Sequence, residues 1–78
     1  MRERTEKCVV SFSTTSAAMA MEAACRAAGL PGRLIPLPRS VSAGCGLCWA
    51  GPPSSREALE DLVVKEHLPI DGIYAIIL

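Results

Sequence analysis

The chain has 78 residues, no formal net charge at pH 7, and a composition that is half hydrophobic. Such a chain can form one domain with a thin core, because a domain of this size buries only roughly 60% of the surface that it exposes when unfolded. The apolar content excludes a disordered protein, and no apolar run approaches the ~18 residues that a membrane-spanning helix needs. We therefore expect one folded domain, residues 7–78, after a loose tail of residues 1–6.

The first residues, "MRERTEK", are charged, and no uninterrupted apolar stretch follows them. This pattern is not that of a secretory signal peptide, so we expect a cytoplasmic protein. Cysteines are mostly reduced in that compartment, whereas a disulfide framework would require a secreted chain. The four cysteines are therefore interpreted as thiols.

The first two predicted elements are a strand and a helix. The segment "KCVVSF" (7–12) is short and rich in β-branched and apolar residues, which is typical of a strand. Thr14 or Thr15 can cap the alanine-rich helix that follows, and Gly29 can end it. Residues at helical spacing predict its buried face: Ala17, Met21, Ala24, Cys25 and Ala28.

Two short strands and a loop occupy the middle of the chain. The segment 32–38 predicts a strand, and Pro36 within it favours an edge position or a bulge. Residues 38–46 are rich in serine and glycine, which indicates a loop, and "LCWA" (47–50) predicts the third strand.

A second helix and a last strand complete the chain. Ser54 and Glu57 form a possible capping box for a helix that runs to about His67, before Pro69. Its predicted inward residues are Ala58, Leu59, Leu62 and Val63. "GIYAIIL" (72–78) is apolar on both faces, which predicts a central strand.

The order β-α-β-β-α-β predicts an α+β, ferredoxin-like fold, in which an antiparallel four-stranded sheet carries two helices on one face. We expect the first and last strands in the middle of this sheet. The face without helices would then be open, and a small aliphatic open face is a possible homodimer interface.

The four cysteines differ in their sequence context. Cys8 alternates with apolar residues in the first strand, and Cys25 lies on the apolar stripe of the first helix, so both are interpreted as core residues. Cys45 lies between Gly44 and Gly46 in the predicted loop and has no packing rationale. This context predicts an exposed thiol that another molecule can approach closely.

The charge around Cys45 is locally positive. Residues 23–56 contain four arginines and no acidic residue. Arg39 and Arg33 are near enough in the sequence to lower the pKa of the Cys45 thiol and so increase its thiolate fraction. A thiolate on a loop is a nucleophile, so Cys45 is the predicted reactive residue.

Cys48 follows Cys45 at C-x-x-C spacing, and it allows two alternatives. It could hold a metal together with Cys45. Because one chain offers no second ligand pair, such a site would be zinc shared between two chains. It could also form a reversible disulfide with Cys45, which would make the pair a redox switch. Otherwise Cys48 is an ordinary residue of the third strand, and we expect no bound cofactor.

The chain resembles a selenium/sulfur carrier protein-like family of small bacterial and archaeal domains. The motifs that carry the resemblance are "FSTTSAAMAME", "GLPGRLIPLPRSVSAGCGLCW", "AGPPSSRE" and "GIYAIIL", which together span about Lys7 to Leu78. The resemblance implies that Cys45 carries sulfur or selenium, framed by Gly44 and Gly46. Arg33, Arg39 and Ser42 belong to the same block and are its implied supporting residues. Cys48 is a further candidate supporting residue, but the resemblance does not imply a cysteine at this position; its presence leaves open a disulfide or trisulfide form.

This resemblance implies a carrier more than a stand-alone enzyme. Its partners would be donor and acceptor proteins of the cysteine desulfurase or sulfurtransferase type. No basic-aromatic strip for RNA is present, so nucleic acid is not an expected partner.

Overall fold

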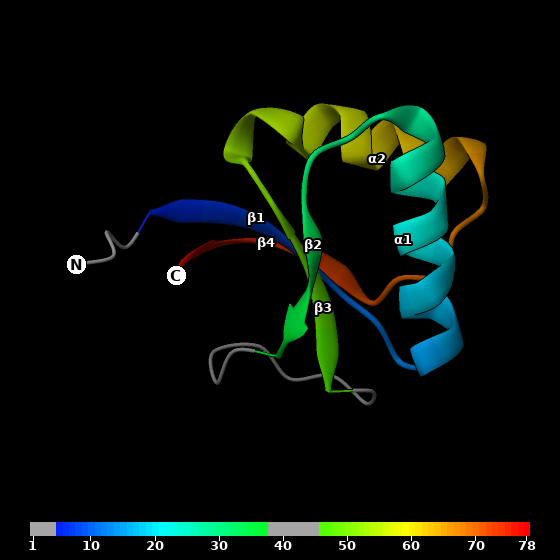
Figure 1. Ribbon diagram of the computed structural model, residues 1–78, viewed down its shortest axis with the longest axis horizontal. Coiled ribbons are helices and arrows are strands. Elements are labelled where there is room, and N and C mark those ends of the chain that lie inside the picture. Colours follow the sequence, from blue (N-terminus) through cyan, green and yellow to red (C-terminus); the bar gives the residue numbers. More distant parts are fainter. Residues whose placement is uncertain (1–4, 38–45) are drawn as a thin grey trace.

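The computed structural model of the protein describes residues 5–37 and 46–78. Its elements follow in the order β1 (Glu6–Ser11), α1 (Thr15–Ala28), β2 (Arg33–Pro36), β3 (Leu47–Gly51), α2 (Arg56–Lys65) and β4 (Gly72–Ile77). A short 3-10 turn, η1 (Pro53–Ser55), precedes α2. The β-α-β-β-α-β order is the predicted one, and Figure 1 shows the two helices on the same side of the strands.

All four strands pair antiparallel in one sheet of order β2-β3-β1-β4. The α+β, ferredoxin-like arrangement is thus confirmed, and β1 is central as predicted. The prediction that β4 is also central is wrong, because β3 lies between β1 and β2 and leaves β4 at the edge. The crossover through α1 sets β2 one strand away from β1, and the β2–β3 hairpin then fills the gap.

The two edge strands differ in character. Pro36 lies in β2, an edge strand, as predicted from its missing backbone donor. In β4 the side chains of Tyr74, Ala75 and Ile77 are exposed, so an apolar sequence here does not mean burial on both faces.

Helix α1 begins and ends as its sequence predicts. Thr14 is the N-cap, and its hydroxyl oxygen accepts a hydrogen bond from the Ala17 N–H at 3.1 Å. Gly29 ends the helix with a φ of 73°, and the Leu30 N–H reaches back to the Cys25 carbonyl at 2.9 Å. The buried residues are Ala17, Ala18, Met21 and Cys25, with Ala24 half-buried. Ala28 is exposed, contrary to prediction, so the buried stripe ends before the helix does.

Helix α2 differs more from its predicted form. The capping box at Ser54 is wrong: Ser55 is the N-cap and makes no side-chain cap bond, because its hydroxyl donates to the Pro52 carbonyl at 3.0 Å. Ala58 is exposed, contrary to prediction, whereas Leu59 and Leu62 are buried as predicted and Val63 is half-buried. The helix ends at Lys65, before the predicted His67.

The end of α2 has a physical cause. His67 has a φ of 52°, in the left-handed region, and the Leu68 N–H donates to the Val63 carbonyl at 3.0 Å. This is the same hydrogen-bond pattern as at the end of α1, with a histidine in the place that glycine usually takes.

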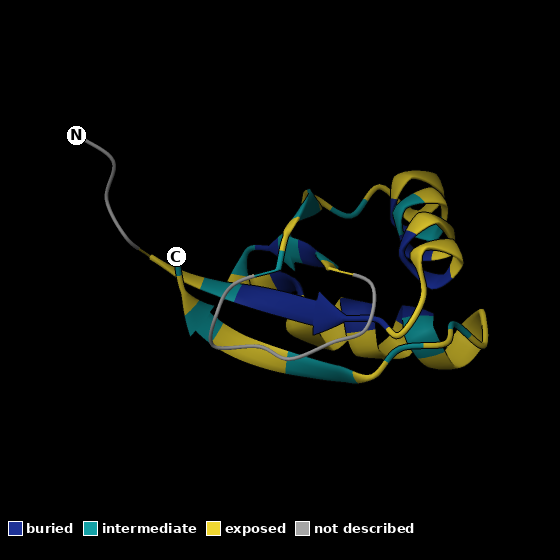
Figure 2. Cartoon of the chain, turned by 90° about the horizontal axis from the view of Figure 1, so that it is seen from below, coloured by how far each residue is buried: buried dark blue, intermediate teal, exposed yellow. Residues whose placement is uncertain are grey.

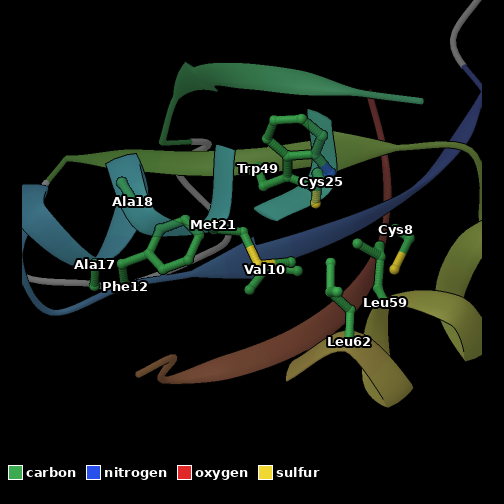
Figure 3. Close-up of a cluster of buried hydrophobic side chains, with 10 residues drawn as sticks. All are labelled: Cys8, Val10, Phe12, Ala17, Ala18, Met21, Cys25, Trp49, Leu59 and Leu62. Atoms are coloured by element: carbon green, nitrogen blue, oxygen red, sulfur yellow. The ribbon is translucent and has the colours of Figure 1, made fainter. Parts of the chain in front are cut away.

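The hydrophobic core lies between the sheet and the two helices (Figure 3). Trp49 of β3 is 2% exposed and Leu59 of α2 is fully buried. Gly32 is required beside the indole, since a Cβ there would lie 2.7 Å from both the Trp49 Nε1 atom and the Ala50 carbonyl oxygen. The full set of buried members is Cys8, Val10, Phe12, Ala17, Ala18, Met21, Cys25, Trp49, Leu59 and Leu62.

Within the described residues, neither helix combines the length and the apolar character that a membrane crossing requires.

Candidate functional site

The candidate site is built on the connection between β2 and β3. These strands pair from Arg33 opposite Ala50 to Pro36 opposite Leu47. Beyond the last pair, the Leu37 N–H donates a hydrogen bond to the Gly46 carbonyl at 3.0 Å. The two described ends of the predicted loop are therefore held together at one end of the sheet.

Gly46, which follows Cys45 in the sequence, has a backbone conformation that favours glycine. Its φ is 75°, in the left-handed region that side chains disfavour, and a Cβ on it would meet no atom within 4 Å. The prediction that glycine supplies a positive φ beside Cys45 is confirmed at this position. The reason for glycine is thus the backbone angle and not a lack of space.

Four of the predicted site residues lie outside the described residues: Arg39, Ser42, Gly44 and Cys45. Their roles therefore stay predictions. Gly46, Cys48 and Arg33 lie within the described part of the chain, and their positions decide what each can do.

Cys48 is a strand residue, as predicted, and it is fully buried. It lies opposite Ser11 of β1 and Ile35 of β2. Since its neighbour Trp49 belongs to the core beneath the helices, Cys48 lies on the other face of the sheet. A partner protein cannot reach this thiol without a local change in structure, which separates Cys48 from an exposed carrier thiol.

The face of the sheet opposite the helices is not as open as its strands suggested. Val9, Ser11 and Cys48 alternate with core residues, yet none of the three has any exposed surface. Figure 2 shows β1 as the most deeply buried strand, whereas much of β4 is exposed. The homodimer interface predicted on this face would therefore lack Val9 and Cys48 as contact residues, and the dimer itself stays a prediction.

Cys8 and Cys25 are both core residues, as predicted. Burial raises the pKa of the Cys25 thiol to about 11. Burial also raises the pKa of the Cys8 thiol, and the nearby Arg56 guanidinium offsets only part of that effect. Both side chains are therefore protonated at neutral pH and shielded, which makes them poor nucleophiles.

Arg33 lies at the start of β2 and is exposed. Pro36 lies three residue steps further along the strand, which is about 10 Å at the usual rise per residue. This places Arg33 away from the end of the sheet to which the loop is attached. Its support of the Cys45 thiolate stays a prediction, because Cys45 lies outside the described residues. Its position gives it another role.

Arg33 lines a groove of about 830 Å³ that crosses β1, β2 and β3. Lys7 of β1 lines the same groove, together with Ile35, Pro36, Ala50 and Leu78. Lys7 was not among the predicted site residues. The alternation of strand 7–12 signals that Lys7, Val9 and Ser11 share a face, but only the pairing of β1 with β3 brings that face beside Arg33.

A metal site receives no support from the described residues, which contain no cluster of three or more His, Cys, Asp or Glu side chains suited to a metal. His67, the single histidine of the sequence, is exposed after the end of α2. The alternative of a zinc ion shared through Cys45 and Cys48 depends on a residue outside the described part and stays untested.

Comparison with known protein families identifies a match. The model of the family described as "Putative Se/S carrier protein-like" matches residues 7–75, which is most of the chain. No curated protein matches. No solved structure matches either.

Proposed function

Because the chain belongs to the Se/S carrier protein-like family, we propose that it carries sulfur or selenium on the thiol of Cys45 and delivers it between partner enzymes. The donor would be a cysteine desulfurase or a sulfurtransferase, and the acceptor an enzyme that consumes the sulfur. The proposal concerns a shuttle between two proteins.

One observation supports the choice of Cys45 above all. The other three cysteines, Cys8, Cys25 and Cys48, are at most 2% exposed. A carrier thiol must enter two protein active sites in turn, which a buried side chain cannot do. Cys45 directly precedes Gly46, whose left-handed backbone lies immediately before the first residue of β3, Leu47.

The transfer step balances without an added oxidant. The Cys45 thiolate attacks the outer sulfur of a persulfide on the donor protein. A new S–S bond forms on Cys45, the S–S bond of the donor breaks, and its electron pair stays on the donor thiolate. The outer sulfur keeps its proton as it moves to Cys45. In the delivery step, a nucleophile of the acceptor attacks the outer sulfur on Cys45, and the Cys45 thiolate leaves.

The test is intact-mass analysis after incubation with a cysteine desulfurase and cysteine. The wild-type chain should gain ~32 Da, the mass of one added sulfur, and peptide mapping should place it on Cys45. Cys45→Ser should abolish this gain, because the nucleophile is removed.

Cys48→Ser is the matched control, since it removes the neighbouring thiol and leaves Cys45. It should still gain ~32 Da. Loading of the Cys45→Ser variant, or a wild-type chain that stays unmodified, would refute the proposal. A loss of two thiols through a Cys45–Cys48 crosslink, with no added sulfur, would favour the redox switch instead.

A further inference from the structure

Two basic side chains that line the groove have no ion-pair partner among the residues that the structure describes. Lys7 and Arg33 come from different strands, β1 and β2, and reach the same surface. By contrast, two arginines of the helices have ion-pair partners: Arg26 pairs with Glu22 at 3.6 Å, and Arg56 pairs with Glu60 at 3.4 Å. The groove thus holds two cations whose charge no described acidic side chain offsets.

The rest of the groove favours a peptide segment over a small ion. None of its described lining residues has a carboxylate side chain, and Ile35 and Pro36 add apolar surface. Its volume of about 830 Å³ is far larger than a simple oxyanion needs, and it lies within the range of roughly 300–1,000 Å³ that is typical of binding sites. An extended segment with acidic and apolar residues would match both the charge and the surface.

Other polyanions fit less well. The described lining residues include no aromatic side chain on which a base could stack. Two cations are also few for a nucleic acid, whose affinity comes from many phosphate contacts. The chemistry of the groove therefore points to a protein.

We propose that this groove docks an acidic segment of a partner protein, with Asp or Glu side chains against Lys7 and Arg33. The inference rests on the proposed function, because it assigns the surface on which a sulfur donor or acceptor binds. The groove extends to Pro36, the last residue of β2, and the next residue, Leu37, is hydrogen-bonded to Gly46. A segment in the groove thus lies along the strand that leads to the connection carrying Cys45.

The experiment compares two variants with equal change in charge. Lys7→Glu/Arg33→Glu reverses both groove cations, and Arg26→Glu/Lys65→Glu reverses two exposed cations on the helices. The rate of persulfide transfer from a cysteine desulfurase is measured against carrier concentration at two salt concentrations. Loading by inorganic polysulfide, a donor too small to need a docking surface, is measured in parallel.

The groove variant should lose about tenfold or more in kcat/KM for transfer from the desulfurase, with a weaker salt dependence, because steering by opposite charge is lost. Its loading by polysulfide should fall far less than its transfer from the desulfurase, because only the protein donor needs the groove, and the helix variant should stay within about twofold of wild type in both assays. Equal losses in the two variants, or no loss in either, would overturn the proposal.

Binding to the desulfurase without cysteine separates docking from sulfur chemistry. If neither donor loads Cys45 but the groove variant still binds more weakly than the helix variant, the proposed function fails and the docking surface stands. Unchanged binding, or no binding by the wild-type chain, refutes the docking surface. If the wild-type chain self-associates and only the groove variant loses this self-association, the groove binds a second copy of the chain. That result would also refute the docking surface for a partner protein.

A second groove variant, with neutral substitutions, tests the proposal if the charge-reversed variant does not fold. Lys7→Gln/Arg33→Gln removes the charges without introducing new ones beside the sheet. It should show the same direction of effect with a smaller loss, and an unchanged transfer rate in this folded variant would contradict the proposal.

Discussion

Gly46 shows how one residue shapes the candidate site through its backbone alone. Its φ of 75° lies where residues with a Cβ are disfavoured, and the space around that Cβ position is empty. The cost of a side chain here is therefore purely conformational. This makes Gly46 a clean position at which to test the geometry next to Cys45.

Gly46→Ala should lower the free energy of unfolding by about 1–2 kcal/mol, the cost of placing an L-residue in the left-handed region. Gly46→Asn is the matched control, because asparagine tolerates this region better, so its loss should be smaller. Urea denaturation followed by Trp49 fluorescence measures both. Equal losses in the two variants would show that the left-handed angle does not determine the effect.

Cysteine reactivity is also decided at the scale of the residue. Cys8 and Cys25 have the same thiol as Cys45, but burial raises the pKa of each. Alternation in a strand and spacing in a helix were sufficient to predict both as core residues. The roles of Arg39, Ser42 and Gly44 stay predictions, because these residues lie outside the described part of the chain.

Helix α1 is the element whose ends follow most directly from local sequence. Thr14 satisfies one N–H group of the first turn, and Gly29 supplies the left-handed residue at the other end. Both are interactions between residues a few positions apart. Such local signals were sufficient to predict where the helix begins and ends.

Replacement of the cap tests this interpretation. Thr14→Ala should lower the free energy of unfolding by about 1 kcal/mol, because the Ala17 N–H loses its acceptor. Thr14→Ser keeps the hydroxyl and should retain most of the stability. The change in the urea midpoint measures both, and a serine variant as unstable as the alanine variant would mean that the methyl group, and not the hydrogen bond, stabilises this helix end.

Strand β4 and the groove could not be predicted from local patterns. The apolar run Gly72–Ile77 predicts a buried strand, but its place beside β1 at the sheet edge depends on where β3 pairs. The groove likewise depends on register: Val9 pairs with Ala50, and Ala50 pairs with Arg33. Lys7 and Arg33 are distant in sequence, so no local motif predicts that they lie on the same surface.

At the scale of the whole molecule, the fold depends on one thin core. The sheet and the two helices share it, and its largest buried side chain is Trp49. A chain of this length has a free energy of unfolding on the order of 4–12 kcal/mol, from the usual 0.05–0.15 kcal/mol per residue. One large cavity in the core would therefore remove much of the total stability.

Leu59 is the residue through which this prediction is best tested. It is fully buried, and it anchors α2 in the core beside Leu62. Leu59→Ala should cost about 2–5 kcal/mol, since the transfer energy of the lost atoms and the cavity add together. Thermal and urea unfolding monitored by Trp49, the single tryptophan of the chain, gives the loss directly.

Val64→Ala is the control on the same helix, because Val64 is 74% exposed and its truncation leaves no cavity. Its effect should stay within about 0.5 kcal/mol. If Leu59→Ala fails to fold, Leu59→Met retains the side-chain volume and should cost less than about 1.5 kcal/mol. Comparable losses for Leu59→Ala and Val64→Ala would contradict a single shared core, because they would mean that α2 contributes to stability mainly through its own helical structure.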